Sequence, residues 1–218
     1  SQTAIDRLWL WENMMEGTDE IVIRGNHDDN NFNGSNTANQ VSEGIFYAIF
    51  NRQIEKFVNT DRKTYFCIDD ISQKFRIIIL DNNLSTAKRN EMYEWFAERL
   101  TELDNNWTIL VMQHYIWGAN TESISTNGQR TIEAINHVYS QIKAHFVGIL
   151  AGHTHVDHYE TEAVNGYLLI ARDANFGTGT DIDSLSFDYV TVDTALGSKT
   201  ISFKKIGRGS DLTLSYET

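Results

Sequence analysis

The sequence contains no proline and only one cysteine in 218 residues. At an average usage of roughly 5%, a chain of this length would carry about eleven prolines, so its turns depend on Gly, Asn, Asp and Ser. Cys67 alone cannot form an internal disulfide or a thiolate metal cluster. Any bound metal ion must therefore be held by His, Asp, Asn or Glu.

Positive charge and long apolar runs are also scarce. The chain has 18 Lys and Arg against 30 Asp and Glu, a formal net charge of −12. This excess repels a phosphate backbone and argues against nucleic acid as a partner. No run of about 18 apolar residues is present, and residues 1–6 lack the pattern of a signal peptide, which argues against a membrane partner. The cytoplasm is the favoured compartment, although nothing in the sequence identifies it.

Three short apolar runs each end in a polar motif that contains histidine. The runs, with the motifs that follow them, are Ile21–Ile23 with Gly25-Asn26-His27-Asp28, Trp107–Met112 with Gln113-His114, and Phe146–Leu150 with Gly152-His153-Thr154-His155. Helical periodicity over residues 38–58, 86–103 and 128–145 separates buried strands, which favours parallel pairing. Because ligands collect at the carboxyl ends of such strands, we expect the three motifs to meet there.

The remaining strands complete the predicted architecture. Residues 64–68 and 75–80 read as an antiparallel pair, and the alternating segments 156–160, 167–171, 187–192 and 200–206 indicate a second, mostly antiparallel sheet. We therefore expect one α/β domain over residues 1–218. Its two packed mixed β-sheets would be flanked by helices in a four-layer α/β/β/α sandwich.

The histidines at the predicted strand ends have the chemistry of metal ligands. Neutral imidazole binds Zn, Mn, Fe and Ni, and an Asn carbonyl oxygen can add a harder ligand. Each residue alone would be an ordinary turn or core residue. All three motifs together at three strand ends arise by chance with a frequency on the order of one in ten thousand or less.

As a set, the motifs resemble the signatures of the calcineurin-like metallophosphoesterase family, which include GNH[DE], a strand-end His and GHxH. The resemblance implies that Asn26, His114 and His153 ligate one divalent metal and that His155 ligates a second. It implies that His27 is the acid near the scissile phosphate and that Asp28 orients its ring. The implied reaction is hydrolysis of a phosphate mono- or diester by a metal-activated hydroxide.

The family's first two signatures, D-x-H and G-D-x-x-D, are absent from the sequence. The simplest interpretation is a chain without the first strand–helix–strand unit, so that the metal centre is impaired and holds one ion or none. Missing strands would also expose a sheet edge, which predicts self-association. The alternative is an inactive binding or scaffold module with the phosphoesterase fold.

Four further residues each have two possible interpretations. Asp81 follows the apolar run Ile77–Leu80 and is either a turn carboxylate or a neighbour of the site. Trp117, Asn120 and Thr121 follow His114 and are either a substrate-facing loop or an exposed connection.

Overall fold

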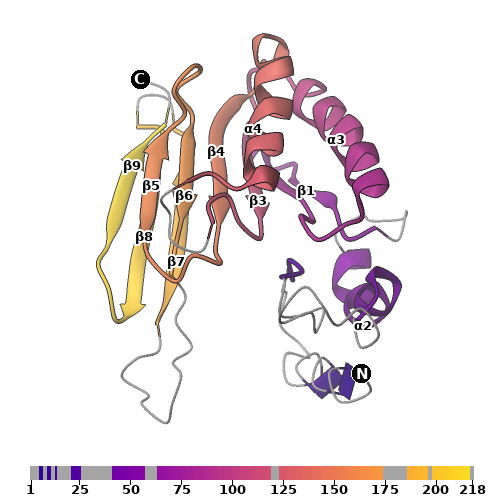
Figure 1. The fold of residues 1–218 in the computed structure, drawn as a ribbon. Coiled ribbons are helices and arrows are strands. Elements are labelled where there is room, and N and C mark those ends of the chain that lie inside the picture. Colours follow the sequence, from indigo (N-terminus) through magenta and orange to yellow (C-terminus); the bar gives the residue numbers. More distant parts are fainter. Residues whose placement is uncertain are drawn as a thin grey trace.

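The computed structural model describes residues 5–6, 9–10, 13, 21–25, 41–56, 63–118, 123–173, 186–195 and 198–216. Figure 1 shows the fold of these ranges. The main elements in chain order are α2 (Glu43–Lys56), β1 (Phe66–Asp70), β2 (Phe75–Ile79), α3 (Thr86–Thr101), β3 (Thr108–Gln113), α4 (Thr126–Val138), the 3-10 turn η2 (Tyr139–Gln141), β4 (His145–Ala151), β5 (His158–Thr161), β6 (Leu168–Ala171), β7 (Ser186–Asp193), β8 (Thr200–Gly207) and β9 (Leu212–Ser215).

Six strands form one mixed sheet in the order β1-β2-β3-β4-β6-β5. The four inner strands are parallel, and β1 and β5 pair antiparallel at the two edges. The inner strands are nearly continuous apolar runs because both of their faces are covered. In the register of β3 and β4, Gln113 is the partner of Ala151, so the segments that begin at His114 and Gly152 leave the sheet side by side.

A bulge in β4 depends on glycine. The pairing with β3 shifts between Ile109 and Leu110, and Gly148 in β4 has a φ of 136°. A Cβ at Gly148 would come within 1.9 Å of the Leu168 carbonyl oxygen in β6. A larger residue would therefore push β4 and β6 apart.

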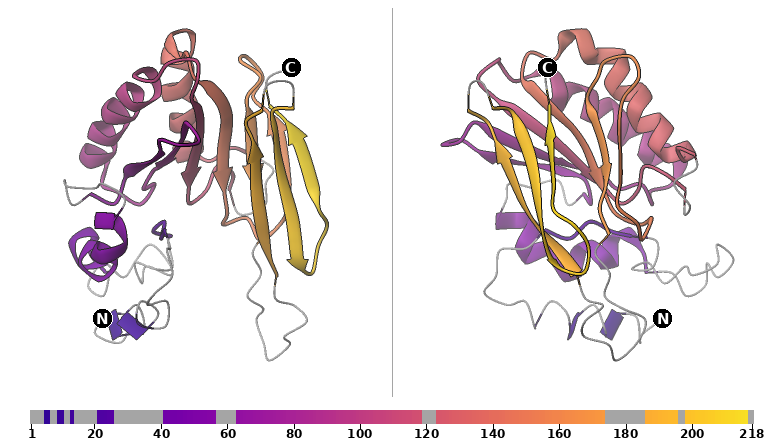
Figure 2. Two further views of the ribbon diagram at one scale, coloured as in Figure 1. Left: turned by 180° about the vertical axis from the view of Figure 1, so that it is seen from behind. Right: turned by 90° about the vertical axis from the view of Figure 1, so that its left-hand side faces the viewer.

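The second sheet is antiparallel, in the order β7-β8-β9. It packs against one face of the larger sheet through a core that includes Leu110, Leu150, Ile170 and Phe203. Figure 2 shows this sheet on the side of the larger sheet opposite to α3. The predicted α/β architecture with two packed sheets is confirmed.

Helices lie on both faces of the six-stranded sheet. On one face, α3 contributes Met92, Phe96 and Leu100, spaced four residues apart, and α4 contributes Ile132 and Ile135 to the main core. On the other face, α2 packs over the β1–β2 end through a second core. The second sheet packs on that same face, and Met112 of β3 contacts both the α2 core and the core of the second sheet.

Four sequence predictions differ from the structure. The segments 156–160 and 167–171 belong to the larger sheet, because β6 pairs parallel with β4 and leaves β5 as its antiparallel neighbour. Ile21–Ile23 is not a strand; Val22 and Ile23 pack their side chains against the α2 core. The helix expected to reach residue 145 ends earlier because Ile142 is extended. Strand β9 was not predicted from the sequence, because only four residues alternate between apolar and polar side chains there.

No helix in the described ranges is both long and apolar enough to cross a bilayer.

Candidate metal centre

His114 lies directly after the carboxyl end of β3. The strand is buried along most of its length, and His114 is the first residue after its end, half-buried. Its backbone carbonyl accepts a hydrogen bond from the Gly152 N–H at 3.1 Å. This contact ties the end of β3 to the first residue after β4.

The segment that follows β4 is a tight turn with two histidines. His153 has a φ of 73° and His155 a φ of 55°, both in the left-handed region. Between them Thr154 is buried; its N–H donates to the Gly152 carbonyl at 2.9 Å and its hydroxyl donates to the Val156 carbonyl at 3.0 Å. The turn therefore places His153 half-buried and His155 exposed.

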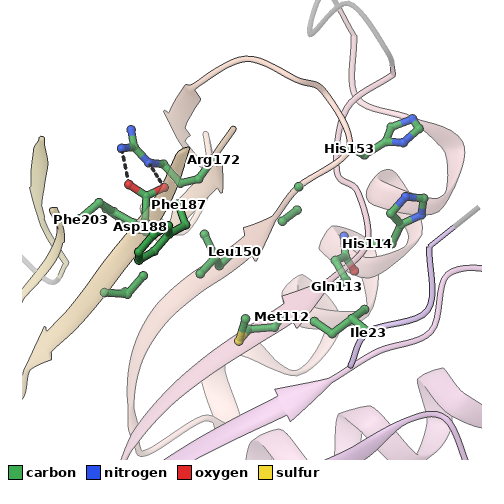
Figure 3. Close-up of a pocket in the computed structure, with 13 residues that line it drawn as sticks. Ile23, Met112, Gln113, His114, Leu150, His153, Arg172, Phe187, Asp188 and Phe203 are labelled. Carbon is green, nitrogen blue, oxygen red and sulfur yellow. Dashed lines mark hydrogen bonds and ion pairs between the residues drawn. The ribbon is translucent and has the colours of Figure 1, made fainter. Parts of the chain in front are cut away.

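The structure brings His114 and His153 together. Their ring centroids are 4.7 Å apart at an interplanar angle of 73°. Both residues line a cavity of about 420 Å³ whose wall is otherwise largely apolar, with Met112, Leu150 and Phe187 among its residues. Figure 3 shows the two imidazoles at one end of this cavity.

The other predicted site residues are not brought into this pair. His155 lies on the same turn but does not line the cavity. Asn26, His27 and Asp28 lie outside the described residues. Across the ranges that the structure describes, no group of three or more His, Cys, Asp and Glu side chains is arranged to hold a metal ion. Two imidazoles from different strands at one cavity nevertheless fit a divalent cation such as Zn, Mn, Fe or Ni, because each can supply one ligand.

Tyr115 also contacts the site, although the sequence analysis did not predict it. Its ring lies 4.9 Å from the His114 ring and 5.1 Å from the His153 ring, centroid to centroid. Its hydroxyl accepts a hydrogen bond from the Asn127 side chain at 2.7 Å, and Arg89 donates to the same Asn127 amide at 2.9 Å. Aromatic residues after a strand are common in cores, so the sequence held no signal for this role.

Asp81, whose role the sequence left open, is a buried ion-pair partner of Arg24. The side chain is fully buried, lies 2.9 Å from Arg24 Nη2 and accepts a hydrogen bond from the Thr64 hydroxyl. Burial raises the pKa of Asp81, while the Arg24 guanidinium and the hydrogen bonds oppose that rise. Arg24 is held a second time, because the Asn83 side chain donates to its backbone carbonyl at 2.7 Å. Asp81 therefore fixes the residue that stands two positions before Asn26.

The expectation for Trp117 is wrong. The side chain is 1% exposed and packs edge-on against His158, with ring centroids 4.7 Å apart. It belongs to the main core that α3 and α4 cover. Asn120 and Thr121 lie outside the described residues.

Comparisons with known proteins identify the fold and the family of this chain. A dimetal phosphatase from Danio rerio has a similar structure, with a TM-score of 0.58 and 14% sequence identity; the match covers 89% of this chain and 71% of that one. At this identity the likeness concerns the fold. No curated protein sequence matches the chain. The family model for calcineurin-like phosphoesterases matches residues 5–157, a span that runs from the first described residues through the two-histidine turn, and the chain therefore belongs to the calcineurin-like phosphoesterase family.

Proposed function

We propose that the protein is a divalent-metal-dependent phosphoesterase that hydrolyses phosphate mono- or diesters. The observation that carries this proposal is the convergence of His114 and His153 at the carboxyl ends of β3 and β4. Family membership supports a hydrolase that acts on phosphoester bonds.

The proposed ligands divide into two sets. Asn26, His114 and His153 would hold one cation, and His155 would contribute to a second. A divalent cation bound there would polarise a phosphoryl oxygen and make water a better nucleophile. The half-buried His114 and His153 at an apolar cavity wall suit this role, because a low-dielectric surrounding strengthens interactions with charge.

Residues of the chain itself would transfer the proton and orient the imidazole that carries it. In the proposal His27 donates a proton to the leaving oxygen, and Asp28 holds the imidazole in the required orientation. Arg24, anchored by Asp81 and Asn83, fixes the start of the segment that carries them. His27 would thus transfer the proton and Asp28 would orient it, while Arg24, Asp81 and Asn83 support the preceding segment.

Metal titration combined with a hydrolysis assay tests the proposal. We expect the chain to take up Zn²⁺ or Mn²⁺ in isothermal titration calorimetry and, when loaded, to hydrolyse bis-p-nitrophenyl phosphate or p-nitrophenyl phosphate. Uptake should be reduced relative to a chain extended upstream with D-x-H and G-D-x-x-D signatures, because those signatures supply further ligands in the family. Absence of uptake and turnover in both forms would contradict the proposal.

An inactive binding or scaffold module is the second candidate function. The observation in its favour is that no group of three or more ligand side chains is arranged to hold a metal ion among the described residues. Metal uptake without turnover of either phosphoester in the extended chain would support this alternative.

We also propose that the chain self-associates through the second sheet. Strand β7 pairs with β8 on one side only, within the residues described, and its Phe187 and Tyr189 are 57% and 66% exposed. A second cavity of about 320 Å³ lies between β7 and the larger sheet, lined by Leu110, Met112 and Val190 among others. An open strand edge beside apolar surface is a site for pairing with a second copy.

Sedimentation velocity over a hundredfold range of concentration checks this association. We expect the weight-average sedimentation coefficient to rise with concentration. The Tyr189→Lys variant should stay monomeric to higher concentration, because a charge on the edge strand opposes pairing. A coefficient that does not change with concentration would argue against self-association.

A further inference from the structure

The backbone of the two-histidine turn is unfavourable and needs support from outside. His153 and His155 both have positive φ, and such non-glycine residues persist only where the surrounding structure holds them. Inside the turn the support consists of the two hydrogen bonds of Thr154.

Asp157 connects the end of the turn to a cluster of charged side chains. Its carboxylate lies 3.0 Å from Arg172 Nη1 and 3.5 Å from Lys205 Nζ. It also accepts a hydrogen bond from the Asp173 N–H at 2.8 Å, and Lys205 Nζ donates to the Asp173 carbonyl at 2.7 Å. Two cations and one backbone amide thus converge on the residue that stands two positions after His155.

Asp188 of β7 pairs with the same two cations. Asp188 lies 2.8 Å from Arg172 Nη2 and 3.0 Å from Lys205 Nζ, which belongs to β8. The side chains of Arg172, Asp188 and Lys205 are 8%, 8% and 2% exposed. Burial disfavours the charge on Asp188, but the hydrogen bonds from Arg172 and Lys205 outweigh it and lower the pKa of this carboxyl. Figure 3 shows the paired Arg172 and Asp188 at the end of the cavity away from His114 and His153.

We infer that Arg172 and Lys205 are positioning residues that act through Asp157 to hold the turn carrying His153 and His155. The inference rests on the proposed function in taking these histidines as metal ligands. The family match ends at residue 157, whereas Arg172, Asp188 and Lys205 all lie beyond it. In this inference Lys205 of β8 links the second sheet to the turn that carries the proposed ligands.

Asp157 and Asp188 bind the same two cations but have different consequences when changed. Removal of the Asp157 charge leaves Arg172 and Lys205 paired with Asp188, so the fold keeps its buried pairs and the turn loses its anchor. Removal of the Asp188 charge leaves two buried cations with the partly exposed Asp157 as their one carboxylate among the described residues, so stability falls while the turn stays attached. The two variants therefore separate positioning from stability.

Hydrogen exchange, zinc titration and thermal unfolding of the Asp157→Asn and Asp188→Asn variants test the inference. In Asp157→Asn we expect the amides of residues 152–157 to exchange about tenfold faster, and zinc affinity to fall by about 10- to 100-fold, because groups behind the ligands fix ligand orientation. Its unfolding midpoint should change less than that of Asp188→Asn. In Asp188→Asn the exchange of the turn and the zinc affinity should stay close to those of the unchanged chain.

Native exchange rates in the turn of Asp157→Asn, or equal acceleration in both variants, would overturn the inference. If the unchanged chain takes up no zinc but Asp157→Asn still accelerates exchange, the proposed function fails and the positioning role stands. The Asp157→Glu variant keeps the charge on a longer side chain, and its exchange rates should fall between those of the other two. It provides the same comparison if Asp157→Asn does not fold.

Discussion

Replacing Asp81 by alanine is expected to lower the free energy of unfolding by about 3–5 kcal/mol, because it leaves the Arg24 guanidinium buried without its carboxylate. Arg24 is 4% exposed and Asp81 is fully buried, so water cannot take the place of the lost partner without rearrangement. The Thr64 hydroxyl would lose its acceptor in the same change. Urea unfolding followed by circular dichroism measures the loss.

An exposed carboxylate provides the matched control for Asp81. Glu98 pairs with Arg99 at 3.4 Å, but its side chain is 71% exposed. Glu98→Ala should therefore change the free energy of unfolding by less than about 1 kcal/mol. Similar small losses in both variants would show that the Arg24–Asp81 pair contributes little. The double change Arg24→Met with Asp81→Leu should recover part of the loss, since it removes both buried charges together.

The framework of the site was predictable because it depends on local patterns. The apolar runs before His114 and Gly152 have the composition of buried parallel strands, and the helical segments between them require parallel connections. The structure places β3 and β4 side by side accordingly, and the His114 and His153 rings meet. Strand pairing beyond this point was harder to predict, since β5 and β6 form an antiparallel pair that completes the larger sheet instead of joining the second one.

The supporting residues were not predictable, because their roles depend on contacts between distant parts of the chain. Asp81 is a turn carboxylate in the sequence, and only its contact with Arg24, 57 positions earlier, distinguishes it from other turn residues. Asp157 has the same local character as any polar residue after a histidine motif. Its contacts with Arg172 and Lys205 come from elements that meet only in the folded chain. Side-chain pattern predicts which face is buried but not which charges will pair there.

The largest functional effects should come from substitution of two histidines, one of which should remove the metal and the other only the turnover. In a metal-loaded, active form of the protein, His153→Ala should lose bound metal and turnover together, because it removes a ligand. His27→Ala should retain its metal and lower turnover by about 10² to 10⁴-fold, as expected when a general acid is removed. Metal content after desalting, measured by mass spectrometry, and initial rates with a chromogenic phosphoester distinguish the two outcomes.

His137→Ala is the control for both variants, because His137 is exposed on α4, away from the ends of β3 and β4. It should retain metal and turnover. Loss of metal from His27→Ala as large as that from His153→Ala would reassign His27 as a ligand. Full metal occupancy in His153→Ala would instead remove this residue from the ligand set, and the contact between the His114 and His153 rings would then be one of packing alone. The metal-to-turnover ratio of each variant thus decides which side chains bind the cation and which transfers the proton.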